Sequence, residues 1–375
     1  MSSPTPLDAG AAGDSAAMAA TSTAIAAPAR AFRFSGRARE FFGIWAVNLL
    51  LTVATLGLYS AWAKVRTRRY FYRHTAFAGE RFDYHAKPTA ILLGRLVASA
   101  LAALYLMVAW LAPGWELIPA AGTFLATPWL LTMGARFNAR NSSYRNVRFS
   151  FSGRLKPAYA AFVGWPILGL LTLGLMMPIS LHRQARWKLD NHRFGSLPFR
   201  FDTATAPYFG LYWKAIGLTL LGGFTILAII VGAVALGAAR VTVEGGQATV
   251  AQTSAVLPAY AALILGYTLA GAYFVTRSMK IGLGTSTLGG HPFVVTMRAR
   301  DVMWLYATNN IAILLTFGLA LPWAKVRTAR YQLQHIALCI DEWTIQRVVA
   351  KRSADASAIG QEVAEAFDVD VDFGI

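Results

Sequence analysis

Long apolar stretches recur along this chain, and they constrain its fold more than any other feature. Five of them contain no Asp, Glu, Lys or Arg over about 20 residues, the length a helix needs to cross about 30 Å of hydrocarbon. Two more qualify, one of them with Arg95 near its start. Together they predict an all-α polytopic membrane protein. The seven hydrophobic segments are 41–63, 91–111, 117–135, 158–181, 216–239, 255–276 and 302–324.

Composition supports a membrane setting and bears on the partners. Charged residues make up 14% of the 375 residues, against about 25% in soluble globular chains. The formal net charge of +17 would suggest nucleic acid for a soluble protein, but cytoplasmic loops of membrane proteins also collect Lys and Arg. We therefore expect membrane lipids as partners and no nucleic acid, and the sequence identifies no protein partner.

Three copies of one motif organise the apolar segments. Phe34-Ser-Gly-Arg37 recurs at 151–154, and Trp62-Ala-Lys-Val-Arg-Thr67 recurs at 323–328. A Thr-Leu-Gly-Leu run at 55–58 recurs at 172–175 and, with Phe for the first Leu, at 316–319. Each copy predicts a short strand, an apolar helix that breaks near the Leu-Gly or Phe-Gly pair, and a basic helix.

These copies divide the chain into a membrane domain and two tails. The predicted tails are a disordered N-terminal segment rich in Ala, Ser, Thr and Pro, and an acidic C-terminal segment. Short strands are expected to flank the repeats, with transmembrane hairpins between them. The boundaries are 1–31 for the first tail, 32–350 for the membrane domain and 351–375 for the second tail. Within the domain they are 32–85, 147–202 and 293–346 for the repeats, and 89–136 and 208–277 for the hairpins.

The distribution of basic residues predicts the topology. Every segment that flanks a repeat is basic, whereas the loops 113–116 and 241–254 contain no Lys or Arg. Either all seven segments cross the membrane, or each repeat dips in and returns, which leaves four crossings. We favour the second arrangement, with both termini cytoplasmic, because 15 residues from Phe41 to Thr55 reach only about 22 Å as a helix.

Several of these motifs, in the same order, resemble the YjgN-like family of bacterial inner-membrane proteins. They are the Phe-Ser-Gly-Arg run, the Thr-Leu-Gly-Leu-Tyr run at 55–59 and the basic segment 61–70. Arg81-Phe-Asp-Tyr84 and Asn141-Ser-Ser-Tyr-Arg145 also match family segments, and the resemblance extends over 32–350. It implies a bacterial inner-membrane location. It transfers no catalytic residue, because the family is a domain of unknown function.

No catalytic or cofactor-binding motif stands out, so we expect neither an enzyme nor a cofactor. The Gly-rich stretch 282–290 lacks the Lys of a phosphate-binding P-loop. The six histidines do not fall at metal-ligand spacing, and the single cysteine, Cys339, excludes an intramolecular disulfide.

The basic helices carry the candidate ligand-binding residues. Arg-x-x-Arg followed by an aromatic residue puts two guanidiniums on one helical face, and the planar Arg fork suits phosphate. Positive-inside topology alone also explains these charges; the functional interpretation is a site for anionic headgroups or a small anionic solute. The residues are Lys64, Arg66, Arg69 and Tyr70; Arg183, Arg186 and Trp187; and Lys325, Arg327, Arg330 and Tyr331.

Two amides inside apolar segments are the other polar candidates. Asn48 and Asn309 occupy equivalent positions of the first and third copies. Buried amides in a membrane usually hold helices together, and a transport pathway is the alternative interpretation.

Two classes of function follow. The first is a non-enzymatic inner-membrane protein that binds anionic lipid headgroups or organises the envelope. The second is a transporter or channel for a small anionic solute. The acidic segment 353–375 predicts a solvated end, or alternatively a tail that folds back onto the basic helices.

Overall fold

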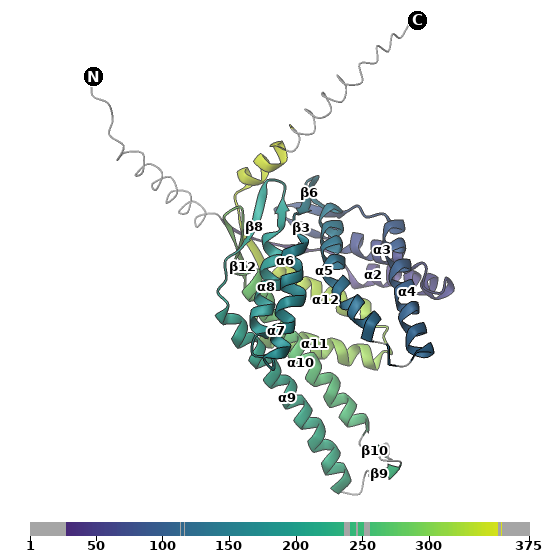
Figure 1. The fold of residues 1–375 in the computed structure, drawn as a ribbon. Coiled ribbons are helices and arrows are strands. Elements are labelled where there is room, and N and C mark those ends of the chain that lie inside the picture. The colour runs from purple at the N-terminus through teal and green to yellow at the C-terminus, as the bar shows by residue number, and fades with distance from the viewer. Residues whose placement is uncertain are drawn as a thin grey trace, which may run out of the picture.

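The computed structural model describes residues 28–112, 114–115, 117–235, 241–244, 247–250, 256–351 and 354. In these residues, helical hairpins extend from one antiparallel sheet, and the α9–α10 hairpin projects furthest from it (Figure 1). The helix pairs are α2 (Ala38–Ala54) with α3 (Ser60–Arg73), α4 (Pro88–Leu111) with α5 (Leu117–Arg140), the continuous run α6 (Leu155–Tyr159), η1 (Ala160–Gly164) and α7 (Trp165–Leu171) with α8 (Met177–Asp190), α9 (Ala206–Ala235) with α10 (Val256–Gly282), and α11 (Ala299–Leu315) with α12 (Leu321–Gln334).

The sheet has eleven strands and nearly closes into a barrel. Its order is β1-β13-β12-β11-β8-β7-β6-β5-β4-β3-β2, and β1 and β2 follow each other directly in the chain. One N-terminal segment therefore joins both edges, which removes the open edges that a sheet otherwise exposes. The strands are β1 (Ala29–Ala31), β2 (Arg33–Phe34), β3 (Thr75–Phe77), β4 (Glu80–Tyr84), β5 (Ser142–Tyr144), β6 (Val147–Phe151), β7 (His192–Phe194), β8 (Leu197–Phe201), β11 (Ser286–Leu288), β12 (His291–Val295) and β13 (Ile336–Cys339); β9 (Val241–Glu244) and β10 (Gln247–Val250) pair separately.

The same cap ends the second helix of all five hairpins. The residue just before the next strand binds, through its side chain, the backbone carbonyl four positions earlier. This contact satisfies a helix carbonyl that would otherwise lack a partner. The pairs are His74 with Tyr70 (2.8 Å), Asn141 with Phe137 (2.7 Å), Asn191 with Trp187 (2.7 Å), Thr285 with Ile281 (2.6 Å) and His335 with Tyr331 (2.8 Å).

The hairpins form a closed ring of five units. The second helix of each unit contacts the first helix of the next: α3 with α4, α5 with α6, α8 with α9, and α10 with α11. The last of these helices, α12, packs against α2 of the first unit, where Val326 joins Phe41 and Tyr70 in a buried cluster. The ring therefore closes in the helices as well as in the sheet.

Each of the three repeat segments turns back at its Leu-Gly or Phe-Gly pair. Both residues of each pair have positive φ, from +48° to +52° at the apolar residue and from +91° to +93° at the glycine. In the first repeat, Thr55 Oγ1 donates to Leu51 O at 2.7 Å and accepts from Tyr59 N at 2.9 Å. The hydroxyl thus links the end of α2 to the start of α3, and Thr172 and Thr316 make the corresponding bonds.

The predicted all-α fold with seven spanning-length segments is wrong. Among the described residues, only Pro88–Leu111, Leu117–Arg140 and Ala206–Gly232 are helices long and apolar enough to span a membrane. The turns divide the repeat segments into helices such as α2, with 17 residues, and α3, with 14. These reach about 25 and 21 Å, short of the hydrocarbon thickness. The strands are also substantial, since they form the sheet that organises the whole domain.

The main hydrophobic core lies inside the sheet. Each unit contributes one residue to each of two sets of core side chains, which we call the upper tier and the lower tier. A C-terminal helix, 342–351, covers the sheet (Figure 1, yellow), and its Ile345 and Val348 are buried there. The upper tier is Phe77, Tyr144, Phe194, Leu288 and Leu338, and the lower tier is Phe32, Phe82, Phe149, Phe199 and Phe293.

Candidate functional site: basic crevices beside the repeat helices

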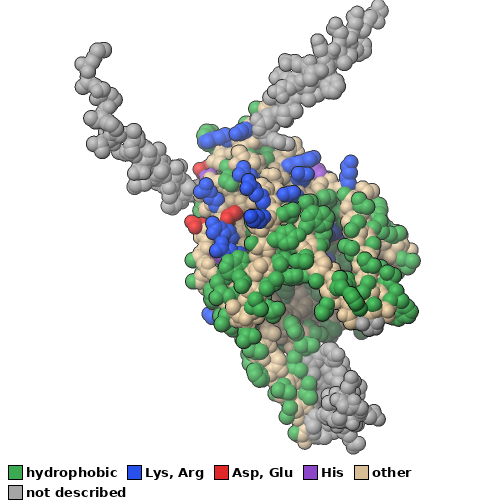
Figure 2. Space-filling model, in the orientation of Figure 1, with side chains coloured by type: hydrophobic (Ala, Val, Ile, Leu, Met, Phe, Trp, Pro, Cys, Tyr) green, Lys and Arg blue, Asp and Glu red, His purple; other side chains and the backbone are tan. Residues whose placement is uncertain are grey.

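Basic side chains gather near the sheet, and apolar side chains cover much of the helical part (Figure 2). The candidate basic residues lie on the second helix of each repeat, α3, α8 and α12. The structure places Arg183 and Arg186 in one crevice and Arg327 and Arg330 in another, each lined by helices of its own repeat.

The crevice of the third repeat lies between α11 and α12 and has a volume of about 650 Å³. Arg327, Arg330 and Tyr331, all predicted site residues, line it together with Trp304. Trp304 is 69% exposed at the rim. Arg300 also lines it, so the crevice combines three guanidiniums with an accessible aromatic ring. The other lining residues are Asp301, Leu305 and Gln334.

Arg327 is held by polar contacts across the crevice wall. Its Nη1 donates to Thr308 Oγ1 at 2.7 Å and to Asn309 Oδ1 at 2.9 Å. The Asn309 amide in turn donates to Thr328 Oγ1 at 3.1 Å, and the guanidinium lies 5.0 Å from the Trp323 ring centroid. Asn309 therefore joins α11 to α12 and positions Arg327.

Asn48, the equivalent amide of the first repeat, lacks such contacts. Its Oδ1 and Nδ2 are buried without a hydrogen-bond partner. Arg66, which corresponds to Arg327, donates instead to Tyr59 Oη at 3.0 Å. The two repeats therefore use the same residues differently.

Arg330 and the aromatic residues support the neighbouring backbone. Arg330 Nη2 donates to Gly36 O at 3.0 Å, which ties the fifth unit to the first. Tyr70 Oη accepts from Arg37 N and donates to Arg37 O, both at 2.9 Å, and Trp187 Nε1 donates to Arg154 O at 3.4 Å. These aromatic residues stabilise the start of the first helix of their own repeat.

The second crevice is smaller and more nearly neutral. It occupies about 260 Å³ between η1, α7 and α8 and is lined by Arg183, Arg186 and Trp187. Arg186 Nε lies 3.2 Å from Asp190 Oδ2, where the third repeat has Gln334. The carboxylate offsets one of the two positive charges.

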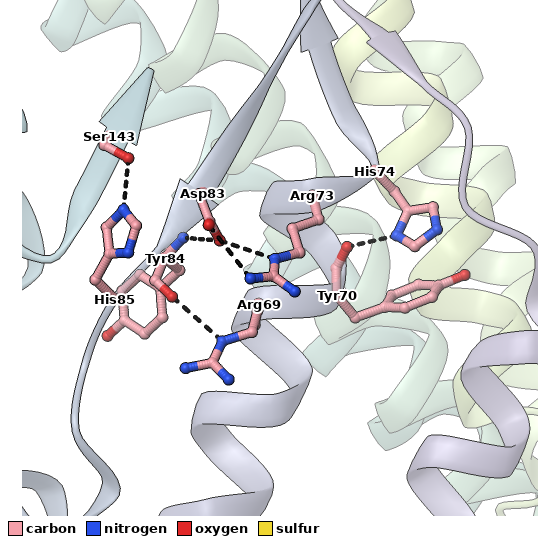
Figure 3. Close-up of polar contacts among 8 residues, drawn as sticks. All are labelled: Arg69, Tyr70, Arg73, His74, Asp83, Tyr84, His85 and Ser143. Atoms are coloured by element: carbon pink, nitrogen blue, oxygen red, sulfur yellow. Dashed lines mark hydrogen bonds and ion pairs between the residues drawn. The ribbon is translucent and has the colours of Figure 1, made fainter. Parts of the chain in front are cut away.

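The basic residues of the first repeat contact the adjoining strand (Figure 3). Arg69 Nε donates to Tyr84 O at 3.4 Å, and Arg73 binds both Asp83 oxygens at 3.0 and 3.3 Å. Burial acts to raise the pKa of the Asp83 carboxyl, but the hydrogen bonds from Arg73 and from Tyr84 N outweigh it and hold that pKa below its ordinary value. Lys64 and Lys325 are exposed on α3 and α12.

Sequence reasoning missed Arg300 and Trp304 as site residues. They lie on α11, outside the basic helices that carry the repeated motif. An interfacial Trp close to an Arg was the available signal. Within the described part of the chain, no group of three or more His, Cys, Asp or Glu could hold a metal ion.

Comparisons with known proteins place this architecture in a family. The Inner membrane protein YjgN of Escherichia coli O157:H7 and that of strain K12 are each 31% identical over 159 residues, 41% of this chain and 39% of theirs. The Salmonella typhimurium protein of the same name is 27% identical over 147 residues, 39% of this chain and 37% of its own. The match thus spans about two fifths of the length of these relatives. No solved structure matches.

The names of these relatives and the spanning helices together support an integral protein of the inner membrane. A family model described as bacterial protein of unknown function (DUF898) matches residues 29–366, most of the chain. The chain therefore belongs to the DUF898 family, which includes the YjgN-like inner-membrane proteins.

Proposed function

We propose that this multi-pass inner-membrane protein binds anionic lipid headgroups by their phosphate in the crevice of the third repeat. The observation that carries this proposal is the placement of Arg327 and Arg330 in one open crevice of about 650 Å³. Guanidinium groups bind phosphate through parallel N–H···O bonds.

The aromatic residues around the crevice support a lipid as the ligand. Trp304 is exposed at its rim, and Trp323 stacks on Arg327. Tryptophan concentrates at the depth of the headgroups. A phosphate bound beside these rings would belong to a lipid in the adjacent leaflet.

The proposed topology places the sheet in the cytoplasm. Both ends of every hairpin lie at the sheet, and Lys and Arg gather around it (Figure 2). Basic residues favour the cytoplasmic side. The α4–α5 and α9–α10 hairpins would cross and return, the three short repeat hairpins would dip into the bilayer, and the C-terminus would be cytoplasmic.

The turns of the short hairpins suit an apolar environment. Their outermost side chains, Leu56, Leu173 and Phe317, are 96%, 94% and 97% exposed. The threonine described above satisfies backbone groups on both sides of each turn, which the hydrocarbon requires because no water is available there.

Native mass spectrometry tests the proposed function. We expect the wild-type protein, released from nanodiscs of phosphatidylglycerol and phosphatidylcholine, to retain phosphatidylglycerol. The double variant R327Q/R330Q should lose most of it. The matched control R148Q/R193Q removes two exposed strand arginines and should retain lipid as the wild type does.

Two results would overturn the proposal. One is equal retention of phosphatidylglycerol by R327Q/R330Q and the control. The other is calorimetric binding of inorganic phosphate that depends on Arg327 and Arg330 while lipid retention does not. That result would favour transport or binding of a small anionic solute.

A further inference from the structure

An apolar chamber of about 210 Å³ lies inside the near-barrel sheet and is lined by residues of both tiers. Its lining is apolar except for Tyr144, and the hydroxyl of that residue donates to Phe77 O at 2.8 Å. No lining polar group therefore needs water. An apolar cavity of this size stays dry and accepts apolar molecules.

The width of the sheet explains why the core leaves this space. Barrels of about eight strands are just filled by their own side chains, and wider ones leave a cavity. This sheet has eleven strands, and all five residues of its lower tier are Phe. In the upper tier, the fourth and fifth units have Leu288 and Leu338 where the first three have larger aromatic rings.

The chamber is covered on the side of the C-terminal helix. Ile340 and Ile345 line it there and are 1% and 2% exposed. Glu342, at the start of that helix, is held by Arg30 at 2.6 Å and by Arg145. The cover is therefore fixed by two ion pairs as well as by packing.

A second cavity adjoins the chamber on the side of the helices. It has a volume of about 380 Å³ and shares Phe32 and Phe82 with the chamber. Its walls come largely from α3, α10 and α12, through side chains such as Phe71, Met279 and Leu333. The two cavities are thus adjacent, and the second one lies among the helices.

We infer that the chamber and the adjoining cavity hold one acyl chain of a bilayer phospholipid. The chamber is apolar and covered at the C-terminal helix, and the adjacent cavity is largely apolar and lies among the helices. This inference rests on the proposed topology, in which the helical layer contacts the bilayer, so a chain that enters from there is a lipid chain. This site is separate from the basic crevices and does not depend on headgroup binding.

Photo-crosslinking tests this inference. The probe is phosphatidylcholine with a diazirine at the end of one acyl chain, mixed into vesicles that contain the full-length protein. After illumination, peptides are mapped by mass spectrometry. We expect adducts on β8, β11 or β13, as well as on the lipid-facing helices α4 and α9. Absence of strand adducts in the wild-type protein would overturn the inference.

The matched variant is one whose side chains fill the chamber. L288F/L338F gives the fourth and fifth units the ring that the first and third units already carry. Strand adducts should fall by at least about tenfold, because a close-packed interior has no room for a methylene chain. Adducts on α4 and α9 should persist and show that the protein is inserted. The control L221F adds a ring on the exposed face of α9 and should leave the strand adducts unchanged.

Undiminished strand adducts in an inserted L288F/L338F protein would contradict the inference. If that variant fails to insert, F194L tests the same idea in the opposite direction. It copies the leucine of the fourth and fifth units, enlarges the chamber and should increase the strand adducts. A decrease would count against the inference.

Discussion

Arg30 donates from Nη1 to the Glu342 carboxylate across 2.6 Å, which joins residues 312 positions apart in the chain. Arg145 binds the other carboxylate oxygen. Arg30 belongs to β1, at the point where the sheet closes, and Glu342 begins the helix that covers it. The Glu342 carboxylate therefore links the C-terminal helix to β1, at the other end of the folded domain, and to Arg145, in the middle of the chain.

We predict that E342Q lowers the free energy of unfolding by about 1.5 to 3 kcal/mol, the range for hydrogen bonds to charged groups. The hydrogen bond from Arg145 is the main cause that lowers the pKa of Glu342 below its ordinary value of 4.5. Since the folded pKa is lowered, the stabilisation is present above 4.5 and disappears as the pH falls through the folded value. Thermal unfolding in detergent at a series of pH values measures both effects.

The neighbouring substitution D341N is the control for this prediction. It removes an acid one position away and should leave the pH dependence unchanged. Equal acid sensitivity of E342Q and the wild-type protein would show that other groups control unfolding.

Replacement of Asn48 and of Asn309 by leucine should shift the unfolding temperature in opposite directions. The Asn48 amide has no partner, and an unsatisfied buried group costs about 1 to 3 kcal/mol. We therefore predict that N48L raises the unfolding temperature. N309L should lower it, because it removes the contacts to Arg327 and Thr328. Thermal shift assays in the same detergent measure the unfolding temperatures of both variants. Shifts of the same sign would contradict the prediction.

The second crevice should gain anion affinity when Asp190 loses its charge. D190N removes the ion pair with Arg186 but keeps an oxygen that accepts from Phe201 N, a bond of 2.6 Å. We expect phosphatidylglycerol retention above that of the wild type, with a stronger dependence on salt. Native mass spectrometry at two ionic strengths measures this, and D202N is the control.

The outermost residues of the short hairpins should lie in hydrocarbon. In a C339S background, cysteine at position 56 carries a nitrobenzoxadiazole label. We expect quenching by lipids brominated on their acyl chains and protection from dithionite added on either side. A label at Ser196, in the exposed turn between β7 and β8, should show the reverse. Rapid reduction of the label at position 56 would exclude insertion of this turn.

The orientation of the domain can be tested with the same background. With Cys339 replaced, S3C offers a single thiol. We predict that an impermeant maleimide added to intact spheroplasts leaves it unmodified and that lysis exposes it. Modification before lysis would place this residue in the periplasm and contradict the proposed topology.

The turns within the repeats could be predicted from the sequence, whereas the sheet that organises the domain could not. The turns at Gly57, Gly174 and Gly318 could be predicted, because glycine is unfavourable in the middle of a helix. The sheet could not be derived, because its strands are two to five residues long and none carries more than two aromatic residues. The hairpins α4–α5 and α9–α10 were predicted, but not as units equivalent to the repeats, because they share almost no sequence with them and only the caps and strands recur.

The candidate site was predicted in part. Arg327, Arg330 and Tyr331 lie in one crevice as their helical spacing suggested. Their opposite wall on α11 could not be predicted, because it depends on how two helices pack. The acidic segment that was expected to be a solvated end or to fold back lies, from residue 355 onwards, outside the described residues.

Every hairpin in the ring starts and finishes at the sheet, so the amino end of one helix lies near the carboxyl end of its partner. Helix macrodipoles arranged in this antiparallel way largely cancel. The ring therefore presents almost no dipolar field along its own axis. The long-range attraction of an anion to this face therefore comes mainly from arginine and lysine side chains, which makes it removable by substitution and by salt.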